Sequence, residues 1–233
     1  MLHVCNIYTA GMSTLRQQRL EADNRAMNPR KTNADQSEAT RGALIAVGRE
    51  LFATRGYANT FTDEVADRAG VTRGALYHHF RRKEDLFRAV YGDVERELML
   101  KITARIARLD AWERLSVGVE AFLEFSLDPA VQRITVLDAP SVLGWDAWRE
   151  IDSKYGYGWL LRASLKAAME AGAIEVQPVE PLAAFIVGGL MEGAMLIARS
   201  DDQEATKREV AKAAGRLMQR QGSANEKSGT EPQ

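Results

Sequence analysis

The fold of this chain is decided by residues 60–80, which read Thr-Phe-Thr-Asp-Glu-Val-Ala-Asp-Arg-Ala-Gly-Val-Thr-Arg-Gly-Ala-Leu-Tyr-His-His-Phe. Thr60 and Asp63 have the spacing of a helix start, where a hydroxyl and a carboxylate accept hydrogen bonds from backbone N–H groups of the first turn. Gly70 is the residue type that ends a helix in the left-handed conformation. Thr72 is suited to cap a second helix. The stretch therefore predicts two short helices separated by a tight turn.

The two faces of the second predicted helix differ in character. Its inward positions, Leu76 and Phe80, are apolar and are expected to pack in the core. Its outward positions are basic, aromatic or without a side chain: Arg73, Gly74, Tyr77 and His78. A helix, a glycine turn and a second helix with a basic and aromatic outer face are typical of a helix-turn-helix motif that binds DNA.

The stretch from Gly42 to Tyr91 resembles the N-terminal domain of the tetracycline-repressor (TetR) family of bacterial transcription regulators. About fifty consecutive residues fit without a gap. The resemblance is carried by Ala53, Gly56-Tyr57, Thr60-x-x-x-Glu64-Val65-Ala66, the run from Ala69 to Phe80, and Lys83-Glu-Asp-Leu-Phe87. It implies an all-α fold of about nine helices, with an N-terminal three-helix helix-turn-helix domain and a C-terminal helical domain for ligand binding and dimerisation.

The resemblance also implies which residues contact DNA. Carried over residue by residue, they are Thr62, Thr72, Arg73, Gly74, Tyr77, His78 and Lys83. Arg73 offers a forked donor for guanine edges or phosphates, and Lys83 places an ammonium and free backbone donors near a phosphate. Phe61 is bulkier than the small polar residue that the family often has there. The alternative is that these are ordinary solvated side chains.

Composition supports a globular chain with an uneven distribution of charge. Hydrophobic residues make up 45% and charged residues 27% of the 233 residues, which suits one or two folded domains. The formal net charge is only −1, but eight basic and four acidic residues lie between Arg41 and Lys83. A basic segment joined to an acidic remainder fits phosphate binding at one end of the molecule.

The scarcity of cysteine and histidine excludes several kinds of site. Cys5 is the single cysteine, so no intramolecular disulfide is possible, which fits a reducing cytoplasm. The three histidines are His3, His78 and His79, so histidine-dependent catalytic triads and the usual zinc sites are excluded beyond residue 79. We therefore predict no catalytic residue, no metal site and no cofactor, and we do not expect an enzyme.

Nothing in the sequence indicates export or membrane insertion. The N-terminus lacks a basic start followed by a long apolar region, so no signal peptide is expected. The longest apolar run, 181–198, contains three glycines and is interrupted by Glu192, which argues against a membrane span. We predict a cytoplasmic protein that associates with the nucleoid when it is bound to DNA.

Composition, apolar periodicity and the family resemblance together suggest four regions along the chain, of which the DNA-binding and effector-binding domains are implied by the resemblance. They are a flexible extension over 1–36, a DNA-binding domain over 37–85 with its motif at about 62–81, a helical effector-binding and dimerisation domain over 86–221, and a disordered tail over 222–233. Translation from Met12 or Met27 is an alternative start. Helices are expected over 37–55 (capped by Ser37), 83–107, 111–127, 129–137, 145–171, 181–200 and 203–220, with 138–144 as a turn or broken helix.

Aromatic residues in the C-terminal domain suggest where an unknown small-molecule effector binds. Trp145, Trp148, Tyr155 and Trp159 fall near one face of the helix expected over 145–171. They form either the wall of a pocket or part of the core. Arg133, Asp138 and Arg162 are candidates for orienting a polar group of the ligand. Because such pockets are mostly apolar, an apolar or aromatic effector is favoured.

Small residues near the C-terminus suggest a dimer interface. Together with positions of the last helix, they could form a bundle of two helices from each chain: Ala184, Gly188, Gly189, Gly193, Val210, Ala214 and Leu217. The alternative is packing within one chain. A homodimer is favoured because a palindromic operator needs two DNA-binding domains related by a two-fold axis.

Together these features predict a sequence-specific regulator that binds double-stranded DNA. We expect a dimeric repressor that a small molecule releases from a palindromic operator by shifting the long helix over 83–107. The alternative is an α-helical module that carries a ligand or binds a protein and does not bind an operator.

Overall fold

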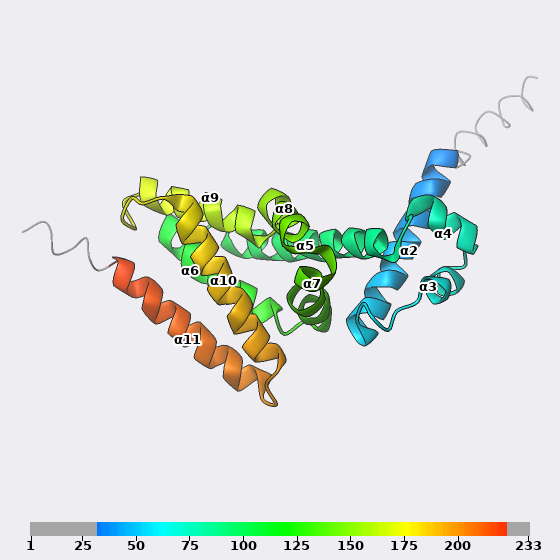
Figure 1. Ribbon diagram of the computed structural model, residues 1–233. Coiled ribbons are helices and arrows are strands. Elements are labelled where there is room, and N and C mark those ends of the chain that lie inside the picture. Colours follow the sequence, from blue (N-terminus) through cyan, green and yellow to red (C-terminus); the bar gives the residue numbers. More distant parts are fainter. Residues whose placement is uncertain (1–31, 223–233) are drawn as a thin grey trace, which may run out of the picture. The chain divides into compact units, whose positions relative to one another are not determined.

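The computed structural model describes residues 32–222, which form ten α-helices and one π-helix and contain no strand (Figure 1). The predicted all-α class is confirmed over this range. The predicted extension up to residue 31 and the predicted tail from residue 223 lie outside the described residues. The contacts of the chain separate residues 1–42 from residues 43–233.

Helix α2 (Asn33–Arg55) begins four residues before the expected start. The backbone N–H of Thr32 donates to Asp35 Oδ2 at 2.8 Å, and the backbone N–H of Asp35 donates to Thr32 Oγ1 at 3.1 Å. This reciprocal pair is a capping box. The prediction that Ser37 caps the helix is therefore wrong, because the Thr32–Asp35 pair already satisfies donors one turn earlier.

The core of the N-terminal helices is aromatic and aliphatic. It joins the second half of α2, α3 (Thr62–Arg68), α4 (Arg73–His79) and the first turns of α5 (Lys83–Ile106). The ring centroids of Phe52 and Phe87 lie 5.1 Å apart in an edge-to-face arrangement, which is favourable for aromatic pairs. Leu76 and Phe80 are buried, as predicted. The inward side of α4 is thus fixed by packing.

The turn before α3 differs from the expectation. Helix α3 follows Phe61, whose side chain makes no capping hydrogen bond. Thr60 is fully buried, and its hydroxyl donates to the carbonyl of Gly56 at 2.9 Å. Thr60 therefore closes the turn between α2 and α3 and does not cap α3. The predictions for the second turn hold, since Gly70 has a φ of +68° and Thr72 Oγ1 accepts from the backbone N–H of Ala75 at 3.1 Å.

Helix α5 runs without a break across the boundary predicted at residues 85 and 86. Its apolar face is buried along the whole length, as predicted: Phe87, Val90, Val94, Leu98, Ile102 and Ile106. The first three of these residues belong to the core that contains α2–α4, and the last three belong to the core of the C-terminal helices. One rigid helix thus contributes to both cores.

The C-terminal helices surround the second half of α5. They are α6 (Ala111–Phe125), the π-helix η1 (Val131–Asp138), α7 (Ala139–Leu143), α8 (Trp145–Tyr155), α9 (Tyr157–Glu170), α10 (Val179–Ala198) and α11 (Gln203–Gly222). The short helix expected over 129–137 is a π-helix, and the segment 138–144, expected as a turn or broken helix, is the short helix α7 followed by Gly144. Helices α10 and α11 lie side by side (Figure 1).

The single long helix expected over 145–171 is two helices, α8 and α9, because the helical conformation is interrupted at Gly156. Asp152 Oδ1 accepts from the backbone N–H of Gly158 at 2.8 Å. A Cβ added to Gly156 would lie 2.7 Å from Asp152 Cα, and a Cβ added to Gly158 would lie 2.0 Å from Asp152 Oδ2. The two glycines therefore allow the Asp152 side chain to close over the start of α9. Helical periodicity continues through this segment, so the sequence pattern did not reveal the break.

Helix α10 is the one helix in the described range that is long and apolar enough to cross a membrane, judged by length and composition. It packs against α6, α9, η1 and α11, and 28% of its apolar window is buried. The exposed remainder of its surface is considered with the candidate interfaces below.

A carboxyl group lies in the core of the C-terminal helices. Glu95 on α5 is only 2% exposed, and its Oε1 accepts from Thr135 Oγ1 at 3.1 Å. Burial, and to a smaller extent the nearby carboxylate of Asp152, raise the pKa of Glu95 to about 8, against the opposing effect of hydrogen bonds from Thr135 and the Tyr157 backbone. Near neutral pH the folded protein therefore holds Glu95 mainly in its protonated form.

This buried acid should make stability depend on pH. The unfolded chain releases the Glu95 proton near its ordinary pKa of 4.5, whereas the folded chain retains it up to about pH 8. The free energy of unfolding should therefore fall as pH rises through this window. Glu95→Gln should remove much of that fall, on the order of a few kcal/mol. Urea unfolding at about pH 5 and about pH 8.5 measures the effect.

Glu120→Gln, a substitution at an exposed position on α6, is the matched control and should keep the wild-type pH dependence. An equal fall in the wild type and in Glu95→Gln would show that Glu95 is not responsible.

Candidate nucleic-acid interface and ligand groove

The outward residues of α3 and α4 form one connected surface, here called the α3–α4 surface and consisting of Thr62, Asp63, Arg73, Gly74, Tyr77 and His78. Arg73 Nε pairs with Asp63 Oδ1 at 3.1 Å, and its guanidinium lies 5.7 Å from the centroid of the Tyr77 ring. The hydroxyls of Tyr77 and Thr62 are hydrogen-bonded at 3.1 Å. Hydrogen bonds with Thr62 and Arg73 lower the pKa of the Tyr77 hydroxyl. The structure thus brings three of the predicted contact residues together.

The rest of this surface is open to solvent. Thr72, Gly74 and His78 are exposed, and an added Cβ on Gly74 would meet only Thr72 Oγ1, at 3.9 Å. Phe61, beside Thr62, is 66% exposed. A partner could therefore approach the backbone at Gly74 closely, with an apolar ring at the edge of the contact.

Lys83 does not have the environment that was predicted for it. Its Nζ donates to the carbonyls of Tyr57 and Thr60 at 2.8 and 3.1 Å and lies 4.2 Å from the centroid of the Tyr57 ring. Partial burial lowers the pKa of this ammonium. Lys83 therefore holds the turn between α2 and α3 against the start of α5, which corrects the expectation of an ammonium available to a phosphate.

Arg133 and Asp138 also lie away from where they were expected. Asp138 Oδ2 accepts from the backbone N–H of Tyr57 at 2.7 Å and pairs with Arg133 Nε at 3.3 Å. The Arg133 guanidinium covers Gly56, where an added Cβ would lie 2.0 Å from Nη2. Neither residue lines the groove described below or the two smaller cavities. They form what we call the η1–turn contact, between the end of η1 and the turn after α2.

A groove of about 270 Å³ lies between α8, α9 and α10. The predicted residues Trp145 and Trp148 line it, with ring centroids 5.1 Å apart, and α10 contributes Met191 and Met195. Trp159 is half-exposed and does not line the groove. Because the helix is interrupted at Gly156, Trp159 does not continue the face of α8 that carries Trp145 and Trp148. The side chain of Tyr155 lies outside the described part of the chain. The groove can hold a small molecule against aromatic rings.

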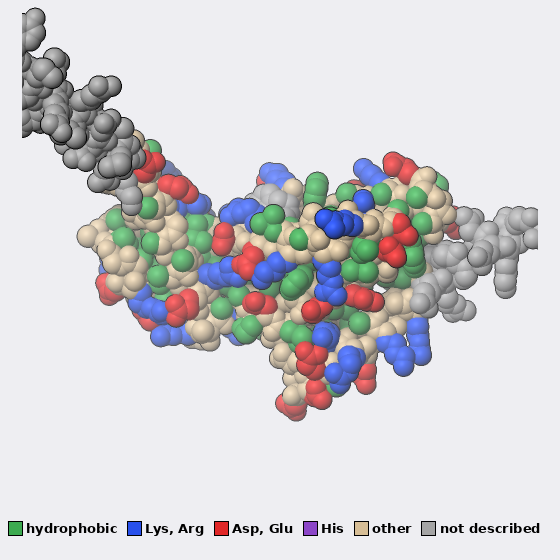
Figure 2. Space-filling view, turned by 180° about the vertical axis from the view of Figure 1, so that it is seen from behind, with side chains coloured by type: hydrophobic (Ala, Val, Ile, Leu, Met, Phe, Trp, Pro, Cys, Tyr) green, Lys and Arg blue, Asp and Glu red, His purple; other side chains and the backbone are tan. Residues whose placement is uncertain are grey.

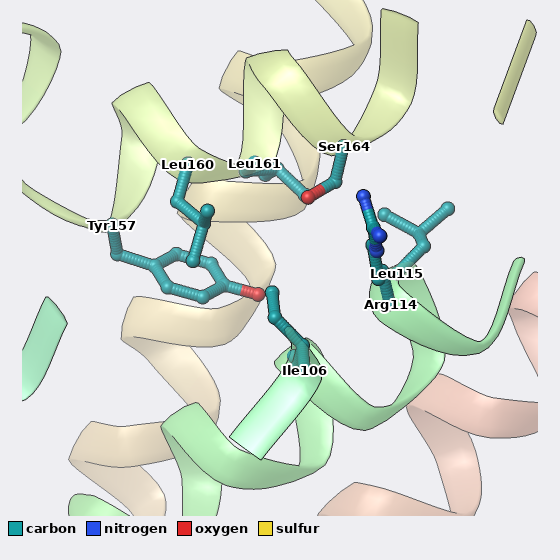
Figure 3. Close-up of a pocket in the computed structure, with 8 residues that line it drawn as sticks. Ile106, Arg114, Leu115, Tyr157, Leu160, Leu161 and Ser164 are labelled. Carbon is teal, nitrogen blue, oxygen red and sulfur yellow. The ribbon is translucent and has the colours of Figure 1, made fainter. Parts of the chain in front are cut away.

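Two other cavities are much smaller, with volumes of about 10 Å³ each. Figure 3 shows the first, in which the Tyr157 hydroxyl points toward Ile106 while Leu160 and Leu161 lie above it. The second is lined by Glu95, Thr135 and Asp152 among others. A cavity of this size holds about one water. Among residues 32–222 no group of three or more His, Cys, Asp or Glu side chains is placed to hold a metal ion.

The predicted dimer residues separate into two groups. Gly193 is buried against α11 of the same chain, since an added Cβ would lie 2.7 Å from Val210 Cγ1, and Val210 and Ala214 pack into the same core. These three residues therefore pack within one chain, which was the alternative to the dimer interface. The predicted residues Gly188 and Gly189 are exposed, and together with Phe185, Glu192 and Leu196, which were not predicted, they form what we call the α10 stripe. Ala184 beside it is partly exposed, and Leu217 on α11 is 71% exposed.

Phe185 is 82% exposed and Leu196 is 53% exposed. The spacing of the stripe follows the helical repeat, so its side chains share one face of α10. Figure 2 shows that, on the face it presents, apolar side chains lie among acidic and basic ones.

Two family models match the chain. Residues 44–90 match the model described as bacterial regulatory proteins of the tetR family, and residues 112–220 match the tetracyclin repressor-like C-terminal domain. The first match contains α3, α4 and the start of α5, and the second contains the helices that form the groove and the α10 stripe.

Several similar proteins are named as transcription regulators. The Tn10 TetC protein of Escherichia coli is 29% identical over 118 residues, which cover 51% of this chain and 60% of TetC, and so less than two thirds of TetC is spanned. The regulator SrpR of Pseudomonas putida is 26% identical over 76% of this chain and 83% of SrpR.

A crystal structure of a TetR-family regulator from Pectobacterium atrosepticum is 33% identical, with a TM-score of 0.67, and the match covers 80% of this chain and 95% of that one. The resemblance noted in residues 42–91 therefore extends over both halves of the molecule, and the chain belongs to the TetR family of bacterial transcription regulators.

Proposed function

We propose that this chain is a dimeric repressor that binds a palindromic operator and is released from it by a small-molecule effector. The observation that carries the proposal is the α3–α4 surface, on which Thr62, Arg73 and Tyr77 are linked and the side chains of Arg73 and Tyr77 are exposed. Such a surface on the second helix of a helix-turn-helix motif suits docking in the major groove of DNA.

The ion pair between Arg73 and Asp63 does not oppose this role. The two side chains are 68% and 58% exposed, and ion pairs between such exposed groups contribute little to stability. Exchanging Asp63 for a phosphate or a guanine edge therefore costs little, and the forked guanidinium matches both partners. In the absence of DNA, the Arg73–Asp63 pair holds the Arg73 guanidinium beside the Tyr77 ring.

The α10 stripe supports the dimer. Phe185 and Leu196 expose apolar surface on either side of Gly188 and Gly189, where an added Cβ would meet nothing within 4 Å. A second α10 can therefore approach the backbone closely and bury both apolar side chains. Two-fold pairing would then present two α4 helices to half-sites about 34–36 Å apart.

The η1–turn contact supports a route from effector to DNA. A ligand in the groove touches α8 and α10, and α8 follows α7 and η1 directly in the chain. Movement of these helices would act on Asp138, which holds the backbone of Tyr57, as well as on α5. A typical coupling of ~1–3 kcal/mol would lower operator affinity about 5–150-fold.

Substitutions on the α3–α4 surface test DNA binding. Arg73→Ala and Tyr77→Ala should each weaken binding to the DNA upstream of the protein's own gene by about 5- to 100-fold, because each removes an exposed donor while leaving the core intact. Fluorescence anisotropy measures the affinity, and Arg108→Ala, at an exposed position distant in sequence from the motif, is the control. Wild-type affinity in both variants would reject this surface. No DNA binding by the wild type would favour the ligand-carrying alternative.

A charge in the α10 stripe tests the dimer. Phe185→Glu should shift the protein toward the monomer in sedimentation velocity, because it places a carboxylate where apolar surface is buried. Leu100→Glu is the matched control, since Leu100 is 72% exposed on α5, away from the stripe. An unchanged dimer in Phe185→Glu would place the interface elsewhere.

Removal of Asp138 tests the η1–turn contact. Asp138→Ala leaves the Tyr57 N–H without its acceptor and should lower the free energy of unfolding by about 1–3 kcal/mol. It should also speed hydrogen exchange at the Tyr57 amide. Asp201→Ala, at an exposed position before α11, should change neither quantity. Unaltered exchange at Tyr57 in Asp138→Ala would show that the contact does not hold the turn.

A further inference from the structure

The groove contains two buried hydrogen-bond donors that have no acceptor among the described residues, Trp148 Nε1 and Arg162 Nη1. Trp148 is 5% exposed. Arg162 Nε is paired with Glu180 Oε2 at 2.8 Å, which leaves Nη1 to another partner. A buried donor without an acceptor costs about 1–3 kcal/mol, and folded proteins retain few of them. The side chains of Trp148 and Arg162 both line the same groove, so an acceptor bound there would satisfy both donors once they turn toward it.

An acceptor stands beside these donors. Asp152 is 8% exposed, and its Oδ1 is used by the backbone N–H of Gly158. An added Cβ on Gly158 would lie 2.0 Å from Asp152 Oδ2 and 2.9 Å from Arg162 Nη1. One carboxylate oxygen and one guanidinium nitrogen therefore lie close together beside Gly158, with no room for a further atom at that point. Because both side chains also line the groove, a head group bound in the groove meets a donor and an acceptor.

The charges around the groove are balanced. Arg149 and Arg162 are opposed by Asp152 and Glu192 among the lining residues. A ligand anion would be repelled by the Asp152 carboxylate, and a ligand cation would be repelled by Arg162 and would leave its Nη1 unsatisfied. A neutral head group avoids both costs.

The remainder of the groove favours a flat ring. Trp145 and Trp148 are inclined at 36° to each other, and the Arg149 guanidinium lies 5.2 Å from the centroid of the Trp145 ring. Met191 and Met195 on α10 supply flexible, polarisable side chains that suit contact with an aromatic surface. A volume of about 270 Å³ accommodates a molecule of one or two rings.

We propose that the groove binds a neutral aromatic molecule whose head group both accepts and donates hydrogen bonds, such as an amide or a hydroxyl. The head group accepts from Trp148 Nε1 and Arg162 Nη1 and donates to Asp152, while the ring lies along Trp145 and the two methionines. The inference rests on the proposed function in taking this groove as the effector site, and it adds the chemical class of the effector.

The test uses four molecules on one naphthalene ring system and the full-length protein. Naphthamide is neutral and both accepts and donates, naphthoate only accepts, naphthylmethylamine is a cation that only donates, and methylnaphthalene does neither. Isothermal titration calorimetry should give the highest affinity for naphthamide. This ranking needs no variant, so it does not depend on how a substitution folds.

Trp148→Phe then tests the head group directly, because it keeps a ring and removes the N–H. It should weaken naphthamide binding about three- to tenfold, as expected for one lost hydrogen bond, and change methylnaphthalene binding by less than about twofold. Trp159→Phe, outside the groove, is the matched control. Tightest binding of any other probe, absence of naphthamide binding, or unchanged naphthamide affinity in Trp148→Phe would overturn the proposal.

A parallel titration of the protein on its DNA separates this inference from the proposed function. Naphthamide binding that depends on Trp148 but does not alter DNA affinity would support the ligand class and contradict effector release. Release of DNA by naphthoate, the amine and methylnaphthalene as readily as by naphthamide would support release and contradict the ligand class.

Discussion

The backbone of Tyr57 is held from two sides, and the placement of both candidate sites depends on it. Its N–H donates to Asp138 at the end of η1, and its carbonyl accepts from Lys83 at the start of α5. The Thr60 hydroxyl closes the same turn onto Gly56. Because all these groups are buried or partly buried, the turn has few alternative arrangements that keep every polar group satisfied. The start of α3 is thereby fixed relative to α5 and η1.

The η1–turn contact lies between the two candidate binding sites. On one side the turn leads into α3 and the α3–α4 surface, where exposed donors suit an anionic partner. On the other side η1 continues into α7 and α8, which carries the aromatic rings of the groove. A π-helix has looser hydrogen bonding than an α-helix and commonly marks functional segments. Its position between the groove and the turn gives a ligand a short path along the chain to Asp138, whose hydrogen bond then reaches the backbone of Tyr57.

Several outcomes show what local sequence signals can and cannot predict. The Thr72 cap, the turn at Gly70 and the buried face of α5 were predicted because each depends on neighbours within a few residues or on simple periodicity. Thr60 and Lys83 were misplaced because the sequence pattern favoured a helix cap for Thr60 and an ammonium facing a phosphate for Lys83. In the structure Thr60 closes the turn onto Gly56, and Lys83 donates to the carbonyls of Tyr57 and Thr60. The local signal at Thr60 is compatible with both outcomes, and spacing carries no information on the partners of Lys83.

The groove residues divide in the same way. Trp145 and Trp148 were found because aromatic residues one turn apart share a face, whereas the break at Gly156 hid the different position of Trp159. The sequence by itself determined the helix-turn-helix motif, the helical class and the family, since these follow from periodicity, turn residues and a run of about fifty matching positions. Only the tertiary structure decided that Arg133 and Asp138 hold a turn, that Gly193 packs against α11, and that Trp148, Asp152 and Arg162 meet in one groove. The reason is that these contacts join residues far apart in the chain, where spacing carries no information about distance.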